Sequence, residues 1–240
     1  MPRFYLPPPL IENSTLMLPE NIVRHIQVLR LKTGDNLTLF NSDGCEYPAQ
    51  LSELGKRHAA CLVGQKHLIN RESPLKIHLI QAISSGERMD FTLQKSVELG
   101  VSSIFPIISE RCVVRLTGER AERKVQRWQE IVIAACEQSG RNTVPQVLPI
   151  MDFSGCLKML PESDLKLLMS LNHAHSLRDF SLPQSVQLMI GPEGGWTAAE
   201  ENAARAAGFQ AITLGQRVLR TETTSLAAIA AMQTLWGDFV

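Results

Sequence analysis

The chain has 240 residues, enough for one large domain or for two modest ones that each bury a core. Its 24 basic and 24 acidic residues balance, which excludes a global attraction to nucleic acid, and a hydrophobic content of 44% excludes disorder and fibrous repeats. No run approaches the roughly 18 apolar residues that cross a bilayer, and the start lacks an apolar signal core, so we expect a cytoplasmic protein with no membrane partner.

The first 72 residues are expected to form a small β-barrel with one helix. Polar turn signals separate short apolar runs, which is typical of small all-β domains. A helix begins near Pro19 and places Ile22, Ile26 and Leu29 on one face. The predicted strands are 37–40, 46–51 and 59–64, and the polar stretch 70–74 is the expected domain boundary.

Residues 73–240 are expected to form an α/β domain, because near-continuous apolar strands alternate with helices. Asp90 is expected to cap a helix that runs to Gly100, and the final helix is expected to start at about Thr223. The other predicted helices are 121–138 and 198–207, and the predicted strands are 77–83, 103–108, 165–171, 186–191 and 211–215.

The cysteines and histidines do not suggest a metal site. The five cysteines are widely spaced without a CxxC motif, and we expect them to be reduced thiols in the core. His173 and His175 have no accompanying cluster of ligands, so no metal is expected. The cysteines are Cys45, Cys61, Cys112, Cys136 and Cys156.

A glycine-rich elbow, GPEGG at 191–195, follows the apolar strand 186–191. Ligands of α/β proteins bind at the carboxyl ends of strands, and Thr197 with Glu200 forms a capping box that starts the next helix firmly. Trp196 stands where a phosphate-binding Walker loop needs lysine, and Glu193 would repel a pyrophosphate. The elbow therefore predicts a neutral or cationic ligand, the alternative being a tight connection alone.

A second loop, LGQRVLRTETTSLAAI at 214–229, also follows a strand end and leads into a helix. Its apolar residues are interleaved with Arg217, Arg220 and Glu222, so it is able to enclose a flat base. The alternative is a long connection with surface charges. Two such loops at adjacent strand ends favour a shared pocket.

These two motifs resemble those of the SPOUT methyltransferases, specifically the bacterial 16S ribosomal RNA uracil-N3 methyltransferase family. The similarity extends through SERCVVRL (109–116), AACEQSGRN (134–142), FTLQKSVELGV (91–101) and VLRLKTGD (28–35). It implies a PUA-like RNA-binding β-barrel over 1–72 and a SPOUT α/β domain with a trefoil knot over 73–240. It also implies S-adenosylmethionine as cofactor, a homodimer with active sites at the subunit interface, and 16S rRNA of the small ribosomal subunit as substrate.

The resemblance implies three walls for the cofactor site. The first wall is Met169, Ser170 and Leu171, and the second is Ile190, Gly191, Pro192, Glu193, Gly194 and Gly195. The third wall is Leu214, Gly215, Gln216, Val218, Leu219, Arg220, Thr221 and Thr223.

Uracil N3 is a poor nucleophile while it carries its proton. We hypothesise that Arg220 or Arg217 stabilises negative charge developing on a uracil carbonyl, with Glu222 or Glu193 as the base. The alternative is that both arginines grip phosphates. The base must be flipped out to react, which requires a grip on the surrounding RNA.

A basic stretch from Arg111 to Arg127 holds six basic and two acidic residues, and is either a solvated helix face or a phosphate-binding patch. The terminal helix is alanine-rich, so it either packs within the subunit or forms the dimer. Two competing functions are a Rossmann-like nucleotide enzyme and a non-catalytic RNA-binding factor. The candidate RNA contacts are Arg3, Tyr5, His25, Arg30, Arg111, Arg115, Arg123, Lys124 and Arg141.

Overall fold

The computed structural model describes residues 1–172 and 174–239. The chain divides into two compact units. The small unit is Met1–Glu72 with Cys136–Val144, and the large unit is Ser73–Ala135 with the chain from Pro145 onward. Across the described residues, no helix has both the length and the apolarity that a membrane crossing requires.

The small unit is built on a six-stranded sheet in the order β1-β3-β4-β5-β2, with β6 paired to β4. The β1–β3 pair is parallel and the other pairs are antiparallel. Helix α1 packs Ile22 and Ile26 into the core beside Phe4. The elements are β1 (Arg3–Tyr5), β2 (Thr15–Met17), α1 (Glu20–Val28), β3 (Asn36–Phe40), β4 (Cys45–Leu54), β5 (Ala59–Val63) and β6 (His67–Leu68).

The apolar face expected for α1 is partly wrong. Leu29 is the C-cap and remains 45% exposed, while Val23 is buried in its place. Arg30 follows in the left-handed region at φ 57°, so the chain leaves the helix before Leu29 joins the periodic face.

Buried charges tie the segment 136–144 into the small unit. Arg141 is 5% exposed and pairs with Glu72, while Arg3 pairs with Glu46 and donates to Asn142. Burial raises the pKa of Glu46, but hydrogen bonds from Arg71 and Arg3 outweigh it and hold this pKa below its usual value.

The large unit is built on a seven-stranded parallel sheet in the order β10-β8-β7-β12-β11-β13, with β9 paired to β8. The predicted α/β class is confirmed. The elements up to the middle of the unit are β7 (Lys76–Ala82), α2 (Glu87–Glu98), β8 (Val101–Ile108), α3 (Gly118–Ser139), β9 (Gln146–Val147), β10 (Met151–Asp152) and α4 (Phe153–Met159). The rest are β11 (Leu165–Met169), the 3-10 helix Leu177–Asp179, β12 (Ser185–Ile190), α5 (Ala198–Ala206), β13 (Gln210–Ile212) and α6 (Thr221–Trp236).

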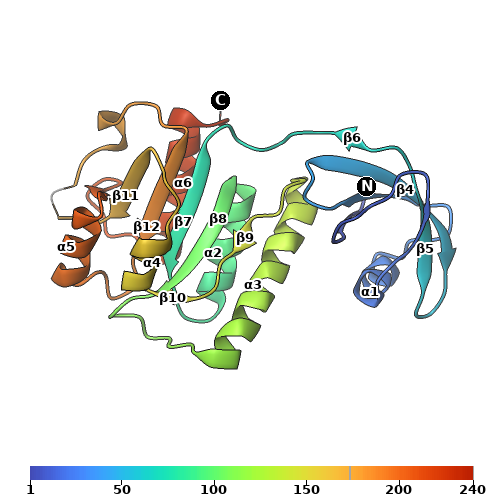
Figure 1. Ribbon diagram of the computed structural model, residues 1–240, viewed down its shortest axis with the longest axis horizontal. Helices are drawn as coiled ribbons and strands as arrows, with labels where there is room; N and C mark the ends of the chain where they lie inside the picture. The colour runs from blue at the N-terminus through green and yellow to red at the C-terminus, as the bar shows by residue number, and fades with distance from the viewer. Residues whose placement is uncertain (173, 240) are drawn as a thin grey trace. The chain divides into compact units, whose positions relative to one another are not determined.

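Alternate strand residues face opposite layers of helices. Ile80 and Phe105 join a core cluster with α4 and α5, whereas Gln81 points to α6, which packs against α2 (Figure 1). Both faces of the parallel sheet are therefore covered, which explains why its strands are apolar throughout.

Asp90 does not cap α2. Gly86 is the N-cap, and Asp90 lies in the first turn of the helix. Its carboxylate instead accepts from Trp128 Nε1 at 3.1 Å and from Lys124 at 3.2 Å, both on α3. These partners are more than thirty residues away in the sequence. The local pattern therefore predicted a helix cap where the carboxylate accepts hydrogen bonds from another helix.

Other local predictions are confirmed. Thr197 and Glu200 form the capping box of α5, and Gly208 follows that helix at φ 90°. The five cysteines are free and buried. Two helix starts were predicted too late: α6 begins at Thr221, two residues before the predicted start, and α3 begins at Gly118 rather than at residue 121.

Removing the carboxylate of Glu46 should destabilise the small unit. We expect Glu46→Gln to cost about 1–3 kcal/mol at pH 7, because Arg3 keeps a largely buried charge without its counter-ion. The folded-state pKa of Glu46 is depressed, so its contribution is present above the ordinary glutamate pKa and is lost as pH falls through the folded pKa. Urea denaturation at pH 7 and at about pH 3 should show the difference from wild type shrinking in acid.

The matched control is Glu20→Gln, which removes an exposed i,i+4 pair and should cost less than about 0.5 kcal/mol. Both tyrosines, Tyr5 and Tyr47, lie in the small unit, so tyrosine absorbance reports its unfolding. Equal losses in the two variants at pH 7 would contradict the role assigned to Glu46.

Candidate functional site

Three loops meet at the carboxyl edge of the parallel sheet in the large unit. They follow β11, β12 and β13, which are neighbours because β11 pairs with both of the other strands. The third loop leads into α6. The strands β11 and β13 end at Met169 and Ile212, earlier than the predicted ends at 171 and 215, because the chain already turns into these loops there.

Trp196 holds the elbow after β12 against the loop after β11. Its indole is 8% exposed and Nε1 donates to the carbonyl of Met169 at 3.2 Å. A Cβ at Gly191 would lie 3.1 Å from this indole, and Gly195 turns the chain at φ 69°. The elbow thus needs glycine at 191 for close packing and at 195 for backbone conformation.

A buried hydrogen-bond node fixes the start of α6. The node consists of Gln81, Thr221, Ser225 and the carbonyl of Gly191. Thr221 Oγ1 donates to Gly191 O at 2.8 Å and accepts from Gln81 Nε2 at 3.1 Å. Ser225 Oγ donates to Gln81 Oε1 at 2.6 Å. Sequence reasoning missed Gln81, whose signal is a single amide within the apolar run IHLIQAI.

The loops enclose a cavity with two adjoining compartments. The arginine compartment has a volume of about 340 Å³ and is lined by Arg88, Arg220, Glu222, Ile190, Gly191 and Thr221. The tryptophan compartment has a volume of about 350 Å³ and is lined by Trp196, Ser170, Leu171, Asn172, Gly195, Glu201, Thr213, Leu214 and Arg217. Both compartments contact Met169, Pro192, Glu193, Val218, Leu219 and Thr224.

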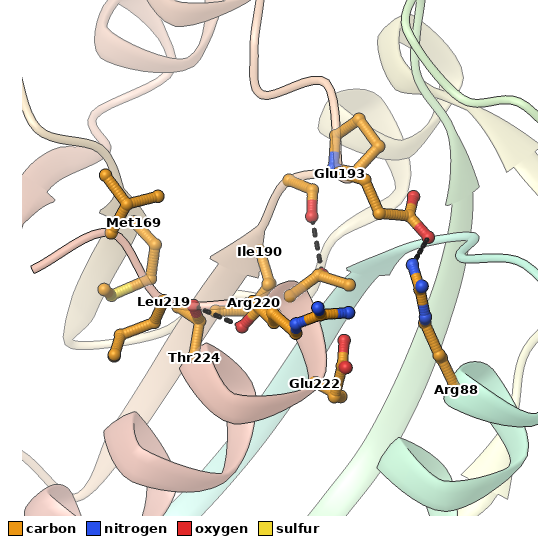
Figure 2. Close-up of a pocket in the computed structure, with 12 residues that line it drawn as sticks. Arg88, Met169, Ile190, Glu193, Leu219, Arg220, Glu222 and Thr224 are labelled. Carbon is orange, nitrogen blue, oxygen red and sulfur yellow. Dashed lines mark hydrogen bonds and ion pairs between the residues drawn. The ribbon is translucent and has the colours of Figure 1, made fainter.

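Two arginines and two glutamates give the arginine compartment its charge. Glu193 accepts from Arg88 Nη1 at 3.2 Å and from the Ser85 N–H at 3.3 Å. Arg220 and Glu222 extend from the start of α6 toward the side where Arg88 meets Glu193 (Figure 2). Glu222 Oε2 is buried without a hydrogen-bond partner among the described residues. Arg88 was missed because it lies far upstream and belongs to no motif.

The tryptophan compartment combines apolar walls with one organised carboxylate. Glu201 accepts from Ser170 Oγ at 2.8 Å and from Asn172 Nδ2 at 3.2 Å. Leu171 is 61% exposed and Val218 is 82% exposed, so part of the wall is free to close on a ligand or a partner.

Most residues proposed for the cofactor site line this cavity, but four do not. Gly194 turns outward, where its carbonyl accepts from Arg111 Nη1 at 3.0 Å. Gly215 and Gln216 lie on the exposed turn of the third loop, and Thr223 is exposed on α6. Thr224, one residue further along the helix, faces both compartments instead (Figure 2).

The candidate RNA contacts fall into two groups. Arg3 and Arg141 are largely buried and pair with carboxylates inside the small unit, so in this structure their guanidinium groups are used internally. His25 and Arg30 are exposed, and Tyr5 is half-buried against the Phe40 ring.

Several side chains of the basic stretch 111–127 make contacts within the large unit. Arg111 braces the elbow, and Arg115 donates to the Glu110 carbonyl at 2.7 Å. Arg123 makes an exposed i,i+4 pair with Glu119, and Lys124 lies 5.3 Å from the Trp128 ring centroid. These side chains keep part of their charge at the surface.

Among the residues that the structure describes, no group of three or more histidines, cysteines, aspartates or glutamates is placed to hold a metal ion. His173 lies outside the described residues.

The fold and the cavity define an α/β protein with a cavity between the loops at its strand ends. Residues 71–233 match the family model described as an RNA methyltransferase domain, and residues 18–63 match the model described as an RNA methyltransferase PUA domain. The chain belongs to this RNA methyltransferase family.

Known proteins resemble the chain along nearly its whole length. It is 36% identical to ribosomal RNA small subunit methyltransferase E of Buchnera aphidicola (strain Sg), covering 99% of this chain and 98% of that protein. The same enzyme of Bacillus subtilis is 32% identical, covering 95% and 94%.

Two solved structures are also similar. The crystal structure of methyltransferase E from Neisseria gonorrhoeae bound to S-adenosylmethionine matches with a TM-score of 0.96 and 58% identity, covering 100% of both chains. A putative methyltransferase from Legionella pneumophila in complex with S-adenosylmethionine matches with a TM-score of 0.95 and 39% identity, covering 99% of this chain and 98% of that one.

Gly191→Ala should displace the Trp196 indole, because the new methyl group would lie about 3.1 Å from it. We expect a loss of about 1–3 kcal/mol and a shifted Trp196 Nε1–H signal in ¹H–¹⁵N spectra. Gly195→Ala is the control: its Cβ meets open space, so only the φ of 69° is strained, at about 1 kcal/mol. An unmoved Trp196 signal in Gly191→Ala would refute the packing argument.

Proposed function

We propose that the chain is an S-adenosylmethionine-dependent ribosomal RNA methyltransferase that methylates N3 of one uridine in 16S rRNA of the small ribosomal subunit. The observation that carries the proposal is the cavity at three strand ends, lined by the two motifs that resemble the uracil-N3 family. Relatives named for small-subunit RNA methylation, and similar structures with S-adenosylmethionine bound, support it.

The cavity residues fit a sulfonium nucleoside. Trp196, Leu171 and Leu214 offer apolar surface for the adenosine, and carboxylates rather than a phosphate clamp lie nearby. When bound, S-adenosylmethionine supplies the methyl electrophile. The protein's own part is to orient the base and to remove the N3 proton.

Arg220 and Glu222 are the favoured catalytic pair. They line the same compartment, whereas Arg217 lines the other. Glu193 is occupied by Arg88 and Ser85, which leaves Glu222 as the better base. Arg220 would then stabilise the charge that develops on a uracil carbonyl.

The remaining expectations belong to the same proposal. Residues 1–72 would form a PUA-like RNA-binding barrel, and residues 73–240 a knotted SPOUT domain. Dimerisation through the alanine-rich α6 would bring a second subunit to the site.

Mapping of methylated nucleosides tests the function. In 16S rRNA from cells lacking this protein, we expect one N3-methyluridine to be absent, and purified enzyme should restore it with labelled S-adenosylmethionine. Calorimetry should detect binding of S-adenosylmethionine and no binding of NAD. This result would exclude the alternative of a Rossmann-like nucleotide enzyme. Detection of methyl transfer would exclude the alternative that the protein is a non-catalytic RNA-binding factor. A full set of methylated nucleosides in the deleted strain would refute the proposal.

Arg220→Ala should lower kcat by about 10²–10³-fold at saturating RNA, because a donor to the developing negative charge is lost. Arg217→Ala, from the same loop but the other compartment, should affect kcat less. Single-turnover kinetics make the comparison. The phosphate-grip alternative predicts instead a raised KM for RNA with kcat unchanged in both variants.

A further inference from the structure

Arg88 enters the cavity from outside the three loops. It lies in the first turn of α2, and its side chain is 42% exposed. A guanidinium carries five N–H donors. Its one side-chain acceptor among the described residues is Glu193, at 3.2 Å from Nη1. Arg88 therefore presents spare donors to the arginine compartment.

The position of Arg88 is fixed by the elbow. Glu193 accepts from Arg88 and also from the Ser85 N–H just before α2, so one carboxylate holds both the helix start and the guanidinium. Figure 2 shows Arg88 rising to Glu193 on the side of the cavity opposite Met169 and Leu219. A fixed donor is what recognition of a flat base requires.

An acceptor and a second arginine line the same compartment. Glu222 Oε2 is buried and has no hydrogen-bond partner among the described residues, so it is a spare acceptor. Arg220, two residues earlier, adds further donors. The compartment thus offers arginine donors together with one carboxylate acceptor.

Uracil and cytosine differ on the edge that such a set would contact. Uracil presents the acceptor O4, the donor N3–H and the acceptor O2. Cytosine presents an amino donor at position 4 and an unprotonated N3, with O2 alone unchanged. A donor–acceptor–donor set therefore matches uracil at all three positions and cytosine at only one.

We propose that Arg88 is a specificity-determining residue that donates to O4 of the target uracil, beside Glu222 at N3–H and Arg220 at O2. The inference rests on the proposed function. With cytosine, the guanidinium of Arg88 would face an amino group and Glu222 would face a lone pair. Sites that read a base edge by hydrogen bonds reject a mismatched analogue strongly, since their buried polar groups are left unpaired.

The same arrangement serves the reaction. The N3 proton passes to Glu222, the N3 lone pair forms the new N–C bond to the methyl group, and the C–S bond breaks with its electron pair remaining on sulfur. The proton then leaves Glu222 to solvent. Negative charge spreads from N3 to O4 and O2 during proton transfer, so both arginines stabilise it.

The test compares Arg88→Met and Arg88→Lys with wild type on RNA carrying either the target uridine or cytidine at that position. We expect Arg88→Met to lower the single-turnover rate on uridine about 10–100-fold at saturating RNA. The uridine-to-cytidine rate ratio should fall at least tenfold, with partial recovery in Arg88→Lys. The Kd for S-adenosylmethionine should change less than about twofold. The matched control is Arg178→Met, an exposed arginine of the same unit outside the cavity.

Glu193→Gln separates base reading from bracing of the elbow. If Arg88 serves only to hold Glu193 in place, Arg88→Met and Glu193→Gln would weaken S-adenosylmethionine binding to the same extent. Both would then leave the uridine-to-cytidine rate ratio unchanged. That result, or wild-type rates in Arg88→Met, would overturn the inference alone. A wild-type enzyme that forms no N3-methyluridine would overturn the proposed function and the inference together.

Discussion

The site depends on the buried hydrogen-bond node of Gln81, Thr221, Ser225 and the Gly191 carbonyl. A side-chain amide inside an apolar sheet is stabilised when its donors and acceptor are satisfied, because burying an unpaired polar group costs about 1–3 kcal/mol. Gln81 is 0% exposed, and its oxygen and nitrogen are both bonded. The requirement fixes one helix start against two strand ends.

The chemistry of the cavity follows from that fixed start. Arg220, Glu222 and Thr224 are the residues around the first turn of α6, so the node sets where they point. The far end of α6 is anchored separately, because Gln233 accepts from Ser73 Oγ and donates to the carbonyl of Leu99. A helix held at both ends presents its side chains in one arrangement, as a preorganised site requires.

The predictable features of this protein are local ones. The elbow and the capping box of Thr197 and Glu200 can be read from adjacent residues, as can the α/β alternation of the large unit. The two loops that follow apolar strands, at 191–195 and 214–229, also indicated where the cavity lies. The trefoil knot and the target base came from resemblance alone and remain proposals.

The features that could not be predicted depend on contacts between distant residues. Gln81 bonds a residue 140 positions away, and Arg88 one 105 positions away, so no window of sequence contains either interaction. Asp90 is of a residue type that often caps helices, but its carboxylate accepts hydrogen bonds from side chains of α3. The pairing of Arg141, a candidate RNA contact, with Glu72 also joins residues far apart in the sequence. The sequence indicated such roles from residue type alone, whereas the contacts of each side chain depend on which distant residues lie beside it.

The most direct measurement is the affinity of S-adenosylmethionine for Gln81→Leu, determined by calorimetry. Gln233→Leu is the matched control, since Gln233 is also a buried glutamine but anchors the far end of α6, away from the node. We predict that Gln81→Leu binds at least tenfold more weakly, while Gln233→Leu loses stability but keeps the wild-type Kd. Wild-type affinity in Gln81→Leu would contradict the claim that the node builds the site.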